Sequence, residues 1–390
     1  MIEELKREFE QNYFKELSSV KGLEKLAEEI KISKNTLRRF LGKMKNENTL
    51  SSSSLNLISN SLNYASFNEF ENSKNHKLNS QFDDGTLLFY QFLKDRKINE
   101  KEVVFWNINL INSKKILQSD EILMGFVQKF KNYPKILEYV LGWHPDYGRI
   151  SQKKYQEILI LAASKTKESH FRVFAYSFAV QGIFLSTRDI SLMEKYVKNA
   201  EVFYYKMLKV KDEFYIFPIL RFSIAQIFLE FSRPSKGFED LADEIISLPK
   251  KQGFDELHTI VFNLHLADAF NILGKYDKAF SLLANYSDQD FNEIWTKYHT
   301  EKYFYFFKIT KIMSMLGQGN IGDATSSFAA FNYNRNDTNI TFDIQPYLDL
   351  QYFTLGYFLD KKNKDIYREK VNFLMNQIGF TKWEEILNRL

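Results

Sequence analysis

The chain has 390 residues, 44% of them hydrophobic, and its formal net charge of +4 by itself indicates no partner. It contains no cysteine, which excludes disulfides, thiolate metal sites and cysteine nucleophiles. With only 15 glycines and 6 prolines it has few of the residues that form tight turns, and this argues against a many-stranded barrel or sandwich. We therefore expect an all-α fold.

The N-terminal segment predicts three short helices. The apolar residues of 2–17 recur at steps of three and four, as on one face of a helix, and a second apolar face follows over 23–30. Ser33 is then a natural N-cap for a third helix. The buried side of this helix would consist of Leu37, Phe40 and Leu41. Three short helices, the last two joined by a tight turn, predict a helix-turn-helix domain.

The predicted turn places demands on a few residues. Ala27 supplies the small side chain that is needed where the two helices pack closely. Glycine is common in such a turn, whereas this chain has Lys31, so the backbone there must be strained or the turn modified. Ile32, Leu37 and Phe40 follow at the spacing that inserts the third helix into the core.

The outward face of the third helix carries residue types that suit double-stranded DNA. Arginine donates two hydrogen bonds to guanine and asparagine pairs with adenine in the major groove, while lysine and serine commonly contact phosphates. Residues 31–45 include six basic residues and no acidic one, whereas the first thirty residues contain eight acids. The predicted DNA-binding residues are Ser33, Lys34, Asn35, Arg38, Arg39, Lys43 and Lys45. The alternative is that these charges form an ordinary solvated helix face.

Segment Leu23–Phe70 resembles the N-terminal domain of many Bacteroidetes proteins, which are described as helix-turn-helix regulators with helical-repeat C-termini. The resemblance is carried by Ile32–Gly42 (ISKNTLRRFLG), Leu55–Ser59 and Tyr64–Phe70. The whole layout is also similar to the peptide-pheromone-responsive regulators of Firmicutes, which couple a helix-turn-helix to a tetratricopeptide domain. The resemblance implies DNA binding and an effector in the C-terminal part, but it carries over no effector-contacting residue.

The first domain boundary is predicted from composition. Residues 46–54 form a polar loop, and a further helix follows with Leu55 and Ile58 facing inward. The stretch 71–84 is the most linker-like in the chain. These features predict a helix-turn-helix DNA-binding domain over 1–70, a linker over 71–84 and a helical domain over 85–390.

The C-terminal domain is predicted to be an array of helix pairs. Amphipathic segments alternate with short breaks, and the pairs recur at roughly 40–45 residues, as in an α-solenoid. One unit matches the spacing of a tetratricopeptide repeat at Asn263, Leu266, Ala267, Phe270, Gly274, Tyr276, Ala279 and Leu283. Residues 316–328 repeat its turn-and-alanine part less faithfully, so we expect a tetratricopeptide-like solenoid.

No enzymatic site is predicted. The chain has no P-loop, dinucleotide-binding glycine pattern or nucleophile elbow, and no zinc motif accompanies His258 and His265, which share a helix face. We accordingly expect no catalytic residue, no cofactor and no metal. The loop 142–148 (GWHPDYG) either lines a pocket or simply turns between helices. The aromatic run 303–307 either packs in the core or faces a groove that binds an extended peptide.

Two functions fit these features. The first is a sequence-specific transcription regulator, whose helical-repeat domain binds a peptide or protein effector, forms a homodimer and changes the spacing of two DNA-binding heads. The alternative is a non-enzymatic adaptor that docks a protein partner in the solenoid groove. The charged N-terminus lacks the apolar core of a signal peptide and no run reaches membrane-spanning length, so we expect a cytoplasmic protein without a membrane partner.

Overall fold

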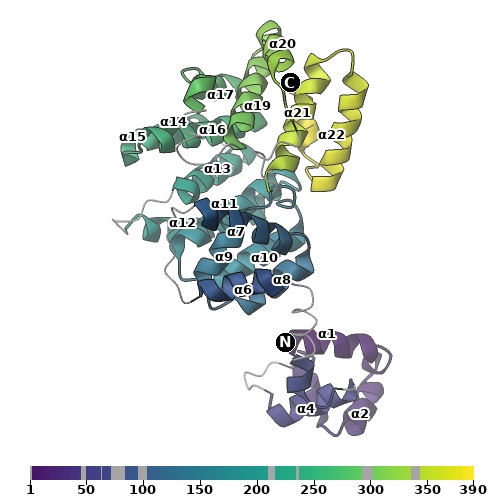
Figure 1. Cartoon of the computed structure of the whole chain (residues 1–390). Helices are drawn as coiled ribbons and strands as arrows, with labels where there is room; N and C mark the ends of the chain where they lie inside the picture. The colour runs from purple at the N-terminus through teal and green to yellow at the C-terminus, as the bar shows by residue number, and fades with distance from the viewer. Residues whose placement is uncertain are drawn as a thin grey trace. The chain divides into compact units, whose positions relative to one another are not determined.

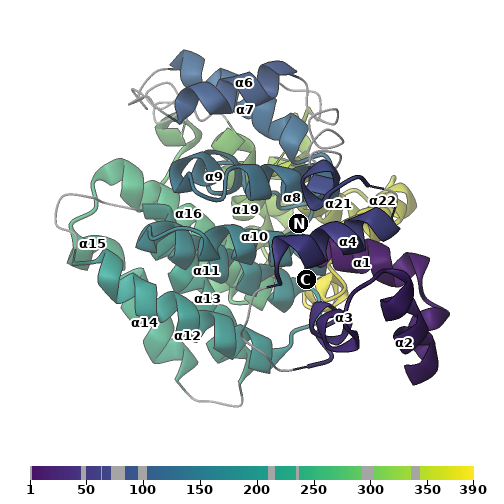
Figure 2. The ribbon, with the colours of Figure 1, turned by 90° about the horizontal axis from the view of Figure 1, so that it is seen from below.

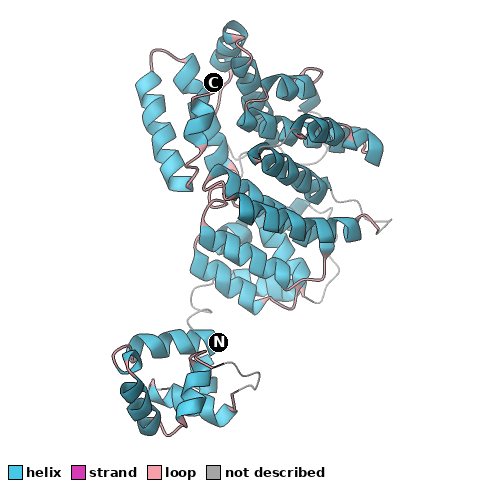
Figure 3. Ribbon diagram, turned by 180° about the vertical axis from the view of Figure 1, so that it is seen from behind, coloured by secondary structure: helices cyan, strands magenta, loops and turns pink. Residues whose placement is uncertain are grey.

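The computed structural model describes residues 2–44, 50–62, 64–71, 84–94, 103–209, 216–233, 237–291, 302–334 and 343–390. Within these ranges all regular structure is helical and no residue lies in a strand (Figure 3), which confirms the all-α prediction for them. No helix in the same ranges is long and apolar enough to cross a membrane.

The chain forms two compact units, Met1–Leu88 and Phe89–Leu390, which we call unit 1 and unit 2. The division falls within helix α6 (Asp84–Leu93). Residues 72–83 of the predicted linker lie outside the described ranges.

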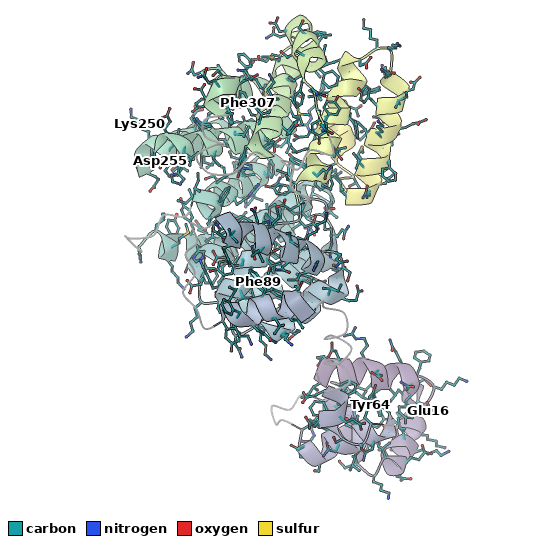
Figure 4. The ribbon with its side chains drawn as sticks, viewed as in Figure 1. Glu16, Tyr64, Phe89, Lys250, Asp255 and Phe307 are labelled. Carbon is teal, nitrogen blue, oxygen red and sulfur yellow. The ribbon has the colours of Figure 1, made fainter. Side chains whose placement is uncertain are left out.

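Unit 1 consists of short helices (Figure 2), and their buried side chains form one apolar core. Its elements are α1 (Ile2–Asn12), the 3-10 helix η1 (Glu16–Ser18), α2 (Val20–Glu29), α3 (Lys34–Phe40), α4 (Ser52–Ser61) and a helical turn over 67–71. The buried core residues are Leu5, Phe9, Leu23, Leu26, Ala27, Ile30, Leu37, Phe40, Leu41, Leu55, Ile58 and Phe70. Tyr64, marked in Figure 4, packs against this core with its ring edge-on to that of Phe70, at 5.0 Å between centroids.

Three helices of unit 1 begin in the same way. Ser19, Ser33 and Ser51 stand in extended backbone just before α2, α3 and α4. Each hydroxyl oxygen accepts a hydrogen bond from the backbone N–H three residues later, at 3.0–3.2 Å. A cap of this kind stabilises a helix by about 1 kcal/mol, so the serines help to fix where these helices start.

Segment 2–17 differs from its prediction as one helical stripe, because α1 ends at Asn12 and η1 follows separately. The chain turns back so closely on α2 that a Cβ on Gly22 would lie 2.2 Å from the carbonyl oxygen of Glu16. The Tyr13 hydroxyl stabilises the turn by donating a hydrogen bond to the carbonyl of Ser61 at 2.7 Å. Position 22 thus requires glycine for a steric reason, which the spacing of apolar residues does not indicate.

The helices of unit 2 follow one another as consecutive pairs, and each pair also packs against its neighbours (Figure 1). Its first helices after α6 are α7 (Val103–Ile116), α8 (Asp120–Lys129), α9 (Pro134–Leu141) and α10 (Lys153–Ser164). The pairs are α11 (Ser169–Leu185) with α12 (Ile190–Met207), α13 (Ile216–Ser232) with α14 (Phe238–Ile246), α16 (Glu256–Leu273) with α17 (Tyr276–Leu283), α19 (Lys302–Gly317) with α20 (Ile321–Ala330), and α21 (Gln345–Leu359) with α22 (Lys364–Ile378). Two short helices, α15 (Leu248–Gln252) and α23 (Trp383–Leu387), complete the unit.

The spacing of these pairs is close to the predicted period. Their first helices begin at Ser169, Ile216, Glu256, Lys302 and Gln345, which places successive starts roughly 40–47 residues apart. Figures 1 and 2 both show α11 lying between α10 and α13, and α11 contacts each of them.

The residues matched to a tetratricopeptide repeat form the α16–α17 hairpin. Ala267 and Ala279 are fully buried. Gly274 has a φ of +74° and closes α16, where its N–H donates to the carbonyl of Asn271 at 3.0 Å and the Lys275 N–H donates to that of Phe270 at 2.8 Å. The hairpin has the turn and the small-residue packing that the pattern predicts, while membership in a tetratricopeptide array stays a prediction.

At two other glycines an aromatic ring packs directly on a helix backbone. A Cβ on Gly317, at the end of α19, would lie 2.2 Å from the ring of Tyr276, the first residue of α17. A Cβ on Gly356, in α21, would lie 2.5 Å from the ring of Tyr367 in α22. The first contact joins one helix pair to the next, and the second joins the two helices of a pair.

The aromatic run 303–307 packs mostly in the core. Tyr303, Tyr305, Phe306 and Phe307 are buried. Phe307, labelled in Figure 4, stacks on Phe291 with ring centroids 4.0 Å apart. The packing alternative therefore accounts for most of the run, and Tyr303 also lines a cavity.

Candidate functional site

The turn between α2 and α3 is built on a lysine in the left-handed region. Lys31 has a φ of +59°. Its N–H donates to the carbonyl of Glu28 at 3.1 Å, and the N–H of Ile32 donates to that of Ala27 at 3.0 Å. These two bonds form a Schellman motif, which normally has glycine at the left-handed position. The strained backbone expected at Lys31 is thus present, and the motif ends α2 sharply before α3.

A second Schellman motif ends α3. Gly42 has a φ of +71°, its N–H donates to the carbonyl of Arg39 at 3.0 Å, and the N–H of Lys43 donates to that of Arg38 at 2.8 Å. The same backbone geometry thus flanks α3 on both sides, once with lysine and once with glycine.

The inner side of α3 is seated on the core of unit 1 as predicted. Leu37, Phe40 and Leu41 are buried. The ring of Phe40 lies edge-on to that of Phe9, with centroids 5.5 Å apart. Because these residues fix the rotation of α3 about its axis, the polar residues between them lie on the outer side.

Ser33 and Lys34 make the closest contacts to the protein among the predicted DNA-binding residues. The Ser33 hydroxyl accepts the hydrogen bond from the Thr36 N–H at 3.0 Å, so it serves as the cap of α3. The Lys34 ammonium forms an ion pair with the Glu24 carboxylate on α2. Glu24 and Lys34 are 10 residues apart on different helices, so no local sequence pattern predicts this ion pair.

Asn35, Arg38 and Arg39 form the remaining outer face. Asn35 is exposed and the two arginines are half-buried. Arg38 makes no side-chain hydrogen bond or ion pair within the described part of the chain, and Arg39 makes a single long contact, 3.5 Å from its Nη2 to the Thr36 hydroxyl. Lys43 is exposed and reaches the Leu17 carbonyl at 3.5 Å, whereas Lys45 lies outside the described residues.

This face can supply the donors that a major groove requires. Two guanidinium groups and one amide stand on one helix. The ammonium groups of Lys34 and Lys43, at the two ends of this helix, are of the kind that contacts phosphates. Glu24 weakens the positive potential at the Lys34 end of the face, so Arg38 and Arg39 are the strongest candidates for base contact.

Unit 2 contains a second candidate site, a cavity of about 540 Å³. Four residues of the loop 142–148 line it, which favours the pocket-lining interpretation of that loop over a simple turn. They are Gly142, Trp143, Pro145 and Tyr147. His258 and His265 also line the cavity, in keeping with their shared helix face. No cluster of potential metal ligands occurs among the described residues.

Comparison of the chain with protein-family models, with curated proteins and with solved structures found no match.

Proposed function

We propose that the protein is a sequence-specific DNA-binding transcription regulator. In this proposal α2 and α3 form a helix-turn-helix in which α3 enters the major groove. Unit 2 is a tetratricopeptide-like helical-repeat domain that binds an effector and mediates dimerisation.

The observation that carries the proposal is the outer face of α3. Arg38 is half-buried and its guanidinium makes no hydrogen bond or ion pair within the described residues, while Asn35 and Arg39 stand beside it on a helix whose opposite side packs in the core. Because no carboxylate or carbonyl among the described residues accepts from it, the guanidinium is available to donate to base edges.

The test compares two double variants of the full-length protein. DNA fragments are first selected by the purified protein and sequenced, and affinity for the recovered site is then measured by fluorescence anisotropy. In Arg38→Ala/Arg39→Ala, the loss of two base-reading side chains lowers affinity for the site by at least about 30-fold, since each such contact is worth about 1–3 kcal/mol. The circular dichroism spectrum stays helical, because neither side chain belongs to the core.

The matched control is Arg7→Ala/Lys15→Ala, which removes the same charge from exposed positions of unit 1 outside α2 and α3. It reduces affinity only slightly and equally for all sequences. Equal losses in the two double variants, or recovery of no preferred sequence by the wild-type protein, contradict the proposal.

Dimerisation and effector binding are further parts of the same proposal. A dimer places two copies of α3 in successive major grooves, about one helical turn apart, and an effector in unit 2 shifts the population between dimer geometries. Sedimentation equilibrium with and without the selected site tests the dimer.

The adaptor alternative predicts a different salt response. Little affinity for DNA at any salt concentration favours it, whereas a regulator loses affinity steeply as salt rises.

A further inference from the structure

We propose that the cavity of unit 2 binds a carboxylate attached to an apolar or aromatic group, and that Arg221 holds the carboxylate. The inference rests on the proposed function only in calling this ligand an effector.

Arg221 is a charged group enclosed in an apolar helix. It is 4% exposed, and most of its neighbours along α13 are buried hydrophobic residues. Its Nη1 donates to the Gln181 side-chain oxygen at 2.9 Å and its Nη2 donates to the Tyr147 hydroxyl. Both acceptors are neutral, so Arg221 keeps a full charge in a site where charges are normally paired.

Within the described residues, three of the five N–H donors of Arg221 have no acceptor. Two are used by Gln181 and Tyr147, and Nε is buried without any hydrogen-bond partner in the described chain. The rings of Tyr147 and Phe178 face the guanidinium at 5.2 and 5.3 Å, and their cation–π attraction stabilises the buried charge without supplying a hydrogen-bond acceptor.

The acids around Arg221 do not neutralise it. Within the described residues no carboxylate lies within 4.0 Å of its nitrogens. Of the two acids that line the cavity, Glu138 lies 3.0 Å from His170 Nε2, and Asp343 lies 3.8 Å from His144 Nδ1. Each acid thus has a basic neighbour of its own.

Asp268 is the remaining acid that acts on Arg221, and it does so from a distance. Its two oxygens accept hydrogen bonds from the Tyr347 hydroxyl at 2.7 Å and from Gln351 Nε2 at 2.5 Å. Burial raises the pKa of Asp268 to about 6 and lowers that of Arg221 to about 10, so Arg221 still keeps its charge at neutral pH. A bound carboxylate would give Arg221 the negatively charged hydrogen-bond acceptor that it lacks among the described residues.

The walls of the cavity define the rest of the ligand. They are mainly apolar and aromatic, and include Trp143, Phe171, Phe174, Phe217, Val261 and Ile344. A volume of about 540 Å³ accommodates a small organic molecule or the last residues of a peptide. The carboxylate could therefore belong to a free aromatic acid or to a peptide C-terminus.

The experiment measures binding to full-length protein by titration calorimetry, with Trp143 fluorescence as a second signal. The probes are phenylacetate and its uncharged amide, and N-acetyl-leucyl-phenylalanine with a free or an amidated C-terminus. At least one free carboxylate binds about tenfold or more tightly than its own amide, because only the carboxylate pairs with Arg221. Which carboxylate binds distinguishes a free acid from a peptide end.

Two variants assign the effect to Arg221. Arg221→Met abolishes the preference for carboxylate over amide. The matched control Lys250→Ala removes a positive charge from an exposed position of unit 2 outside the cavity and keeps the preference to within about threefold. Carboxylate and amide binding equally to the wild-type protein, no binding of either carboxylate, or an unchanged preference in Arg221→Met overturns the inference. The wild-type comparison needs no variant to fold, and because it involves no DNA, its failure is separate from failure of the proposed DNA binding.

Discussion

Replacing Lys31 with glycine should stabilise unit 1, because the lysine occupies a backbone conformation that favours glycine. A non-glycine residue in the left-handed region costs about 1–2 kcal/mol. Glycine also has more conformational freedom in the unfolded chain, which lowers the free energy of unfolding by roughly 0.4–1 kcal/mol. The expected net gain from Lys31→Gly is thus about 0.5–1 kcal/mol in the free energy of unfolding of unit 1. The Lys31 side chain is exposed and makes no hydrogen bond or ion pair within the described residues, so little else changes.

Hydrogen–deuterium exchange of the full-length protein measures this gain where it arises. Peptides covering α2 and α3 should exchange about two- to fivefold more slowly in Lys31→Gly than in the wild type. Peptides from unit 2 serve as the internal reference.

Two further variants separate backbone strain from charge. Lys31→Ala removes the same charge but keeps a Cβ, so its exchange should stay close to that of the wild type. Gly42→Ala introduces the same strain at the end of α3 and should cost about 1 kcal/mol. Its new Cβ would approach only the flexible end of Lys6, at 3.3 Å, so the cost is conformational. If Lys31→Gly is no more stable than Lys31→Ala, the strain argument is wrong.

Three other predictions concern packing, pH and charge. Gly317→Ala should lower the free energy of unfolding of unit 2 by about 1–3 kcal/mol, measured by urea unfolding, because its Cβ would overlap the Tyr276 ring. In a double-mutant cycle with Tyr276→Leu, this cost should fall by at least about 1 kcal/mol. Additive effects of the two substitutions would exclude the ring contact as the cause. Burial raises the pKa of Asp268 from 3.8 to about 6, so its contribution to stability is present in full below pH 3.8 and is lost as the pH rises through about 6. Relative to Asp268→Asn, the wild type should therefore lose on the order of 2–3 kcal/mol of unfolding free energy between pH 4 and 7, and a difference independent of pH would contradict this. Glu24→Gln releases Lys34 and should raise affinity for DNA roughly three- to tenfold at low salt, measured by anisotropy, whereas unchanged affinity would show that Lys34 does not approach the phosphates.

Much of unit 1 could be predicted from local patterns, because its helices begin and end at residues with local signals. Ser33 marks the start of α3, and the apolar spacing of Leu37 and Phe40 sets which side is buried. The separation of η1 from α1 could not be predicted in the same way. It depends on the approach of Glu16 to Gly22, which is a contact between elements and leaves no periodic trace.

The hairpins of unit 2 were predictable where glycine and alanine mark the turn and the close packing, as at Gly274 and Ala267. The cavity was not, because its lining comes from several helices that the chain brings together only on folding. A signal for its central residue was nevertheless present. Arg221 is the single charged residue within the apolar segment Ile216–Leu229, and a lone charge in a helix that is apolar on all sides suggests a functional site.

The glycine–tyrosine contacts constrain how this sequence can diverge. A side chain at position 317 would occupy the space of the ring at position 276. A side chain at position 356 would likewise occupy the space of the ring at position 367. A homologue that gains a side chain at either glycine must lose the facing ring, so the two positions of each pair should change together. The members of each pair lie on different helices, so each exclusion depends on helix packing and not on the neighbouring sequence. They could therefore identify distant relatives of this fold after overall sequence identity has faded.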